Sequence, residues 1–250
     1  MKVAVQLYTI RDKISEDYIR ALKVVSEIGY SAVEFAGHPF GTVKAEELRQ
    51  LLESLSLKPV SAHVSFKNLE KEPEKVLSYA TQLSLNYIVS EPNVIAMKNL
   101  EDCLEAAEKM NRIGERARDA GMRFGMHNHA SEFEVKFNGK TAYEILIENT
   151  DPEFVFFQPD VYWVRYAGYD PIVIIRQLKG RCFLVHLKDM GADGGIAELG
   201  QGIIDFKAVV EAGEASGVDW YIVENDRPSL DSFESIKVAL KYLKDNFEVE

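Results

Sequence analysis

The chain opens with the segment Val3-Ala4-Val5-Gln6-Leu7-Tyr8-Thr9-Ile10-Arg11-Asp12, in which an alternating, strand-like run passes into a polar turn that contains no glycine. A stretch with helical spacing follows, and its apolar stripe consists of Tyr18, Ala21, Leu22, Val25 and Ile28. In a doubly wound open sheet, the first such turn carries a glycine-rich phosphate loop. Its absence favours the other common arrangement of repeated βα units, a closed barrel.

Further segments rich in β-branched and aromatic residues recur at spacings of roughly 30 residues, and each is followed by a stretch with helical periodicity. The eight predicted strands are Val3–Tyr8, Ala32–Ala36, Pro59–Val64, Tyr87–Ser90, Arg123–Asn128, Phe154–Gln158, Cys182–Leu187 and Trp220–Glu224. No linker or shift in composition divides the series. We therefore predict an α/β fold with one domain over residues 1–250, a single (β/α)₈ TIM barrel.

Two helix starts are marked by their capping chemistry. Asp170-Pro171 places a capping carboxylate before a proline at the first helical position. The segment Asp231-Ser232-Phe233-Glu234 approximates a capping box. Both features predict helices that begin directly after these residues.

Composition and charge exclude several classes of protein. The chain has 40 Asp and Glu against 29 Lys and Arg, a formal charge of −11, so its field repels nucleic acid and anionic membranes. Its two cysteines, Cys103 and Cys182, cannot form a disulfide framework and are expected in the core. With no signal peptide at the N-terminus and no long apolar run, the chain is expected in the cytoplasm.

Polar residues gather where the predicted strands end, which in a barrel is the face that forms the active site. The residues are Gln6, Tyr8, Glu34, His38, His63, Glu91, His127, Asn128, His129, Glu132, Asp160, His186, Lys188, Asp189, Glu224 and Asp226. Two carboxylates and an imidazole, Asp160, Glu224 and His186, follow or end three successive strands. This set predicts a site for one divalent cation, Mn²⁺, Mg²⁺, Co²⁺ or Zn²⁺, with a fourth ligand from the fifth strand.

These motifs, in this order, resemble the sugar phosphate isomerase/epimerase superfamily, the xylose isomerase-like barrels that include ketose 3-epimerases, inosose dehydratases and apurinic endonucleases. The resemblance covers essentially the full length of the chain. Its motifs are Val5-Gln6-Leu7-Tyr8-Thr9-Ile10-Arg11-Asp12, Gly29-Tyr30-Ser31-Ala32-Val33-Glu34, His127-Asn128-His129-Ala130-Ser131-Glu132-Phe133, Asp160-Val161-Tyr162-Trp163, His186-Leu187-Lys188-Asp189, Gly200-Gln201-Gly202-Ile203-Ile204-Asp205 and Glu224.

The resemblance implies that Asp160, His186 and Glu224 are metal ligands and that Glu224 also acts as an acid or base. The fifth strand departs from the pattern, because the ketose epimerases have a glutamate where this chain has His127, with a carboxylate only at Glu132. Either residue could complete the site. Since a hard cation prefers carboxylate oxygen, we expect Glu132 at or near the metal and His127 facing the substrate, both taking part in catalysis.

Such a site predicts a metal-dependent sugar isomerase or epimerase that acts on a ketose through an enediolate, with Glu224 as the base. Dehydration or lysis of a keto-sugar or inosose by β-elimination is the alternative, because an imidazole on the fifth strand removes the symmetry of two carboxylate bases. An apurinic endonuclease would need a basic face, which the charge of −11 argues against. A non-catalytic sugar-binding barrel would bind ligands without turnover.

The substrate is expected to be a small carbohydrate. Its predicted contacts are Gln6, Glu34, His63, His129, Trp163 and Lys188. For Glu34 and Glu91, pairing with an Arg or Lys at the rim is an equal alternative to a substrate contact. The aromatic faces of Tyr162 and Trp163 suit the C–H surfaces of a sugar in the pocket. Exposed loop aromatics also serve contacts between barrels, so a homo-oligomer is an open alternative.

Overall fold

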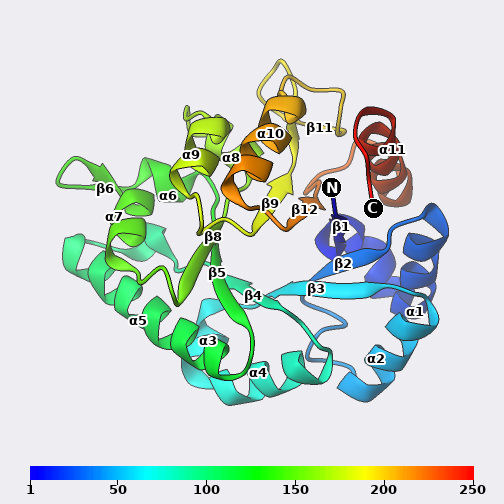
Figure 1. Ribbon diagram of the computed structural model, residues 1–250, viewed down its shortest axis with the longest axis horizontal. Helices are drawn as coiled ribbons and strands as arrows, with labels where there is room; N and C mark the ends of the chain where they lie inside the picture. The colour runs from blue at the N-terminus through cyan, green and yellow to red at the C-terminus, as the bar shows by residue number, and fades with distance from the viewer.

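The computed structural model describes residues 1–250 and contains one sheet of eight strands joined by parallel pairing (Figure 1). The strands follow one another around the sheet in the order β8-β5-β4-β3-β2-β1-β12-β9. Their bounds are β1 Val3–Gln6, β2 Ala32–Ala36, β3 Lys58–His63, β4 Tyr87–Ser90, β5 Arg123–His127, β8 Val155–Gln158, β9 Leu184–Leu187 and β12 Trp220–Val223. All eight predicted strands are confirmed, each to within about two residues at either end.

A seam between β8 and β9 closes the barrel. The two strands form no regular ladder and are joined by a single parallel bridge between Asp160 and His186. The amide of His186 donates to the carbonyl of Pro159 at 3.0 Å, and that of Phe157 donates to Arg181 at 2.8 Å. Because Pro159 has no N–H to donate, the pairing cannot continue as a full ladder there. The fold is therefore the predicted (β/α)₈ barrel, closed between β8 and β9 by a bridge between two of the predicted metal ligands.

Helices cover the outside of the sheet, as Figure 1 shows. Their bounds are α1 Arg11–Ile28, α2 Ala45–Ser54, α3 Phe66–Lys71, α4 Pro73–Gln82, α5 Leu100–Asp119, α6 Ser131–Glu134, α7 Ala142–Asn149, α8 Val161–Tyr166, α9 Pro171–Gln177, α10 Phe206–Ser216 and α11 Ser232–Asn246. None of these helices combines the length and apolar character that a membrane span requires. The chain ends lie together, where the amide of Glu250 donates to the carbonyl of Met1 at 3.0 Å.

Several short elements were not predicted. Two 3₁₀ helices, Leu7–Ile10 and Val94–Ala96, follow β1 and β4. Two hairpins consist of two-residue strands: β6 Lys136–Phe137 with β7 Lys140–Thr141, and β10 Asp189–Met190 with β11 Ile196–Ala197. The first strand therefore stops at Gln6 rather than Tyr8, and the Gln6 side chain caps the turn by accepting from the Tyr8 amide.

The predicted helix caps are confirmed only in part. Asp170 accepts from the amide of Ile172 and Pro171 is the first residue of α9, as predicted. Asp231 also caps α11 by accepting from the amide of Phe233. Glu234 does not complete a capping box, because its carboxylate instead receives a hydrogen bond from Lys237 one turn later.

The interior of the barrel separates into an apolar layer and a polar layer. The apolar layer is a cluster of nine residues: Ala4, Ala32, Val60, Tyr87, Val89, Phe156, Leu184, Trp220 and Ile222. On β5 this layer has Gly125, where a Cβ atom would lie 2.3 Å from the Phe156 ring. Period-2 alternation along each strand then brings the next inward residues, among them Gln6, Glu34 and His127, above the apolar layer. The two cysteines are buried and unpaired, as expected.

Candidate active site

A cavity of about 860 Å³ opens at the carboxyl ends of the strands. Of the eleven residues predicted as catalytic, substrate-binding or metal-binding, six line it: Gln6, His63, His127, His129, Trp163 and Glu224. The other five, Glu34, Glu132, Asp160, His186 and Lys188, are nearly or wholly buried behind this wall. The predicted residues thus form one site with two layers, a wall that a substrate can touch and a buried layer that supports it.

His186 is the centre of the buried layer and lies between two carboxylates. Its Nε2 is 2.6 Å from Glu34 Oε1, and its Nδ1 is 2.8 Å from Glu224 Oε2. Burial disfavours a charged imidazole, but the two carboxylates outweigh it and raise the pKa of His186 to about 10. In the metal-free protein, His186 is therefore an imidazolium bridging Glu34 and Glu224.

Glu34 is wholly buried and its carboxylate is fully engaged. Besides His186, it accepts hydrogen bonds from a set of polar side chains: Gln6 at 2.8 Å, Ser61 at 2.5 Å and Gln158 at 2.8 Å. Burial would raise the pKa of Glu34, but the neighbouring imidazoles of His63 and His186 lower it below its ordinary range. Glu34 thus lies beneath the cavity, and it pairs with histidines rather than with an Arg or Lys at the rim.

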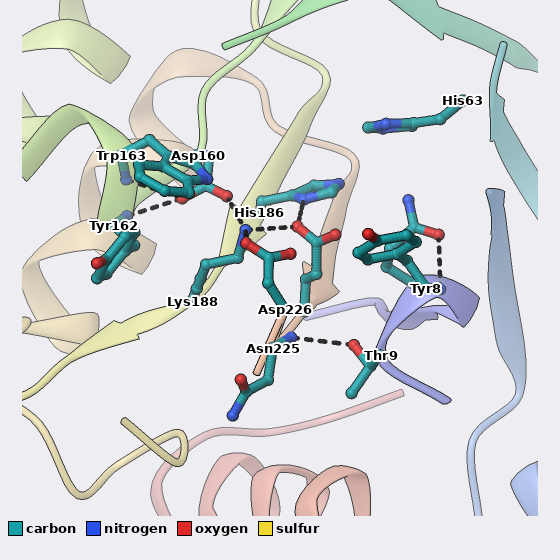
Figure 2. Close-up of polar contacts among 12 residues, drawn as sticks. Tyr8, Thr9, His63, Asp160, Tyr162, Trp163, His186, Lys188, Asn225 and Asp226 are labelled. Atoms are coloured by element: carbon teal, nitrogen blue, oxygen red, sulfur yellow. Dashed lines mark hydrogen bonds and ion pairs between the residues drawn. The ribbon is translucent and has the colours of Figure 1, made fainter. Parts of the chain in front are cut away.

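A second buried cation, Lys188, lies among three carboxylates (Figure 2). Its Nζ is 2.8 Å from Asp160 Oδ2, 2.8 Å from Glu224 Oε2 and 2.9 Å from Asp226 Oδ2. Although burial opposes the charge, these carboxylates raise the pKa of Lys188 above its ordinary value. Asp160 uses its other oxygen to cap α8, accepting from the amides of Tyr162 and Trp163. The positive charge of Lys188 therefore offsets the charges of these buried carboxylates, and its side chain does not line the cavity.

His127 is a buried histidine of the site that forms no hydrogen bond or ion pair with a carboxylate. Its ring lies 4.6 Å from His186, 4.9 Å from His63 and 5.1 Å from His129, between ring centroids. Burial, reinforced by the charges of His186 and His63, lowers the pKa of His127 well below its usual value. Its Nδ1 is buried and has no hydrogen-bond partner. A neutral imidazole with a free nitrogen is a ready metal ligand or proton acceptor.

Four side chains bring potential metal-binding atoms to one place. One ligand atom each from His127, Asp160, His186 and Glu224 lies within 4.8 Å of the others, and all four residues are buried. Imidazole and carboxylate are the donors that Zn²⁺ and Mn²⁺ accept in proteins. The His127 ring brings one of its nitrogens to this group and forms no hydrogen bond, so the residues present fit a divalent cation.

Glu132 does not belong to this group of four. The chain turns after β5 into α6, and the carboxylate of Glu132 is used within that turn, where it accepts from the amide of His129 at 2.7 Å and the hydroxyl of Ser131 at 3.0 Å. The structure therefore has His127 among the four potential metal ligands and Glu132 outside them. This is the opposite of the expectation for the fifth strand, which was based on the preference of hard cations for carboxylate oxygen.

The supporting residues Ser61 and Gln158 were missed in the sequence. Both occupy inward positions on predicted strands, and Gln158 holds His63 as well as Glu34, with 2.8 Å between its Oε1 and the His63 Nε2. Alternation along the strand would have found Gln158, which is two residues from Phe156 in the apolar layer. Ser61 directly follows Val60 of that layer, and it comes beside Glu34 because the register of β3 against β2 shifts there, which alternation does not predict. An uncharged strand residue gives no other signal of its role.

Aromatic side chains form one side of the cavity. Tyr162, Trp163 and Tyr166 of α8 all line it, and the Trp163 ring packs edge-on against His129 at 5.6 Å. On another side, Tyr8 is stacked under the guanidinium of Arg11 at 4.2 Å. The cavity thus offers flat apolar faces on its walls and charged groups on its floor, the combination that suits a polyhydroxylated ring.

Comparison with known proteins identifies relatives of this chain. An inosose dehydratase of Lacticaseibacillus casei is 32% identical over 160 residues, which cover 55% of this chain and 52% of that protein. An inosose dehydratase of Clostridium beijerinckii is 28% identical over 170 residues, covering 59% of this chain and 55% of that protein. The chain spans about half the length of the curated relatives it matches.

Solved structures share the fold over nearly the whole chain. A sugar phosphate isomerase/epimerase from Parabacteroides distasonis has a TM-score of 0.86 at 23% identity, covering 98% of this chain and 94% of its own. The IolI protein, solved with a binding zinc atom, has a TM-score of 0.75 at 19% identity and coverages of 98% and 97%. The sequence profile described as xylose isomerase-like TIM barrel matches residues 22–246. The chain belongs to the xylose isomerase-like TIM barrel family.

Proposed function

We propose that this protein is a metal-dependent enzyme that removes the proton next to the carbonyl of a polyhydroxy ketone, with loss of water as the overall reaction. The observation that carries the proposal is the group of His127, Asp160, His186 and Glu224 at the floor of a large polar cavity. The zinc atom in the similar IolI structure supports a metal at such a site. The name shared by the curated relatives, inosose dehydratase, supports dehydration.

The four donors would hold one divalent cation, Mn²⁺, Mg²⁺, Co²⁺ or Zn²⁺. When bound, the cation acts as a Lewis acid that stabilises negative charge developing on the carbonyl oxygen of the ketone. Glu34 fixes the orientation of His186 from behind, as carboxylates that receive the second nitrogen of a ligating histidine do. To serve as a ligand, His186 would have to be neutral at the ring nitrogen that faces Glu224.

Glu224 is the base of the proposed reaction. It is 8% exposed and lines the cavity, so one side of its carboxylate is accessible to a bound ligand. Burial would raise the pKa of Glu224, but the cations of Lys188 and His186 lower it well below its ordinary value. The carboxylate is therefore ionised, which is the form in which it can accept the substrate proton. Lys188 keeps it in place through their 2.8 Å ion pair.

Substrate recognition is assigned to the wall of the cavity. Trp163 presents an aromatic surface to the C–H face of a sugar or cyclitol ring. Gln6, His63 and His129 offer hydrogen bonds to hydroxyl groups at the same wall. Glu34 and Lys188, predicted as substrate contacts, act in this proposal by positioning His186 and Glu224.

Epimerisation or isomerisation of a ketose is the second candidate, because it begins with the same proton removal. The structure of D-psicose 3-epimerase in the presence of D-fructose shares this fold with a TM-score of 0.75 at 16% identity, covering 98% of this chain and 99% of its own. The two reactions differ in the second proton transfer. Epimerisation returns a proton to carbon, whereas dehydration delivers one to a departing hydroxyl.

The test is an assay of the purified protein, first stripped of metal and then supplied with each cation, using inosose and a series of ketoses in D₂O. We expect metal-dependent release of water from inosose, and a Glu224→Gln variant that binds metal but reacts at least 10²-fold more slowly. Exchange of the α proton followed by a change of configuration, without water loss, would favour the epimerase. A metal-replete wild-type protein that neither exchanges protons nor converts any of these ketones would refute the proposal.

A further inference from the structure

Glu91 follows β4 at the next inward position of the barrel. Tyr87 and Val89 of that strand belong to the apolar layer, and alternation brings Glu91 to the same face above them. Glu91 lines the cavity together with His63, His129 and Glu224. It is thus a carboxyl group on the wall of the site, and it lies outside the group of four metal-binding side chains.

The strand order places Glu91 across the cavity from Glu224. Between β4 and β12 lie β3, β2 and β1 in one direction and β5, β8 and β9 in the other. The barrel is closed between β8 and β9, so the two strands are diametrically opposed. A ring bound between them has one carboxyl group on each side.

Among the acidic side chains of the site, Glu91 is also the one that has no hydrogen-bond or ion-pair partner in the protein. Its neighbours Glu34, Asp160, Glu224 and Asp226 are each held by hydrogen bonds or ion pairs. The side chain of Glu91 makes neither, although it is mostly enclosed and faces the cavity. Such a group has its bonding capacity free for a ligand.

The surroundings of Glu91 favour its neutral, proton-carrying form. Burial raises the pKa of Glu91, opposed by the imidazoles of His63 and His129 and assisted by the carboxylates of Glu132 and Glu224. A carboxyl group whose pKa is raised, lying across a cavity from a second carboxyl group, fits the pattern by which the general acid is assigned in enzymes with two carboxylates.

We propose that Glu91 is the catalytic acid that protonates the departing hydroxyl group, an inference that rests on the proposed dehydration. Glu224 takes the proton from the carbon next to the carbonyl, and the electron pair of that C–H bond forms the carbon–carbon double bond. The C–O bond on the next carbon breaks as Glu91 transfers its proton to the oxygen, which leaves as water. Exchange with solvent then returns Glu91 to the acid form and Glu224 to the carboxylate.

The experiment compares wild type and Glu91→Gln on inosose with Mn²⁺ in D₂O, measuring α-proton exchange and water loss separately. Because Glu91 has no protein partner, the variant is expected to keep the fold and the Mn²⁺ affinity of wild type, checked by circular dichroism and calorimetry. We expect water loss to fall by about 10²-fold or more while α-proton exchange continues. Glu101→Gln, an exposed carboxylate at the start of α5, is the matched control and should behave as wild type.

The outcomes separate this inference from the proposed function. Water loss at the wild-type rate in Glu91→Gln would overturn the role of Glu91 and leave the dehydratase standing. Loss of exchange and water loss together, with Mn²⁺ affinity intact, would overturn it as well, because Glu91 would then serve the first proton transfer. A wild-type protein that does not dehydrate inosose at all would overturn the proposed function itself.

Discussion

Glu34 shows how a single buried carboxylate can organise the residues around a cavity that it does not itself line. Its charge lies between the imidazoles of His186 and His63, and its remaining lone pairs accept from neutral side chains. A substitution there should therefore act on the orientation and charge of His186 rather than on substrate contacts. The sequence left two equal interpretations of Glu34, a substrate contact or a partner of an Arg or Lys at the rim. The sequence pattern around a strand-end glutamate is the same whether its partner is a substrate, a lysine or a histidine.

We predict that Glu34→Gln lowers the free energy of unfolding of the metal-free protein by about 3 kcal/mol at neutral pH, because it leaves a buried imidazolium with one carboxylate instead of two. Metal affinity should fall by about 10–100-fold, the usual effect of removing the partner of a ligating histidine. Urea denaturation and Mn²⁺ titration calorimetry measure the two effects. Glu46→Gln, on the exposed face of α2, is the control, and equal behaviour of the two variants would exclude this role.

Measurements of metal affinity should show whether the metal ligand is His127, which ends β5, or Glu132, which follows it in α6. His127→Gln should reduce Mn²⁺ or Zn²⁺ affinity, because His127 contributes an unpartnered nitrogen to the group of four donors. Glu132→Gln should leave the affinity within a few-fold of wild type, since its carboxylate serves the turn into α6. Calorimetry measures the affinity of both variants. The reverse result would return Glu132 to the metal site and exclude His127.

At the scale of elements, regular strands could be predicted and the short elements between them could not. Eight apolar runs of four to six residues carry a clear pattern, and their order alone brings the polar strand ends to one face. The hairpin of β10 and β11 has only two residues in each strand, too few for alternation to appear. Glu91 could be placed at a strand end from the sequence, but its position across the cavity from Glu224 follows only from the order of the strands in the closed barrel.

The segment from Asp189 to Ile204, which contains this hairpin, is held by one buried carboxylate. Asp189 accepts from four backbone amides, those of Met190, Gly200, Gly202 and Ile204. Gly202 lies so close that a Cβ atom would be 2.3 Å from Asp189 Oδ1. Since Gly195 and Ile196 of this segment line the cavity, the hydrogen bonds of Asp189 hold in place a segment that forms part of the cavity wall.

We predict that Asp189→Asn loosens this segment while the barrel stays folded, because an amide oxygen accepts more weakly and its NH₂ group opposes the amides that face it. Limited proteolysis should cleave within residues 190–204 at least several-fold faster than in wild type. Asp193→Asn is the matched control, since Asp193 lies at the tip of the hairpin and accepts from one amide only. Equal cleavage of Asp189→Asn and wild type would show that the carboxylate does not hold the segment.

At the scale of the whole molecule, the closure of the barrel and the proposed metal site coincide. Around the rest of the sheet, neighbouring strands share regular ladders, but β8 and β9 share one bridge, formed by Asp160 and His186. These two residues are also two of the four donors. A cation bound there would join the two sides of the seam directly, so metal binding and barrel closure should be coupled.

The coupling predicts a local pattern of stabilisation. A cation at about 100 times its Kd adds roughly 2.7 kcal/mol to the free energy of unfolding, which for a chain of this size raises the Tm by about 5–11 °C. If the seam is the weakest closure, amides of β8 and β9 should exchange faster than those of β2 and β3 in the metal-free protein and gain the most protection on binding. Hydrogen exchange with and without Mn²⁺ measures this. Asp160→Asn should lose both effects, and protection spread evenly over all eight strands would show that the seam opens no more readily than the rest of the barrel.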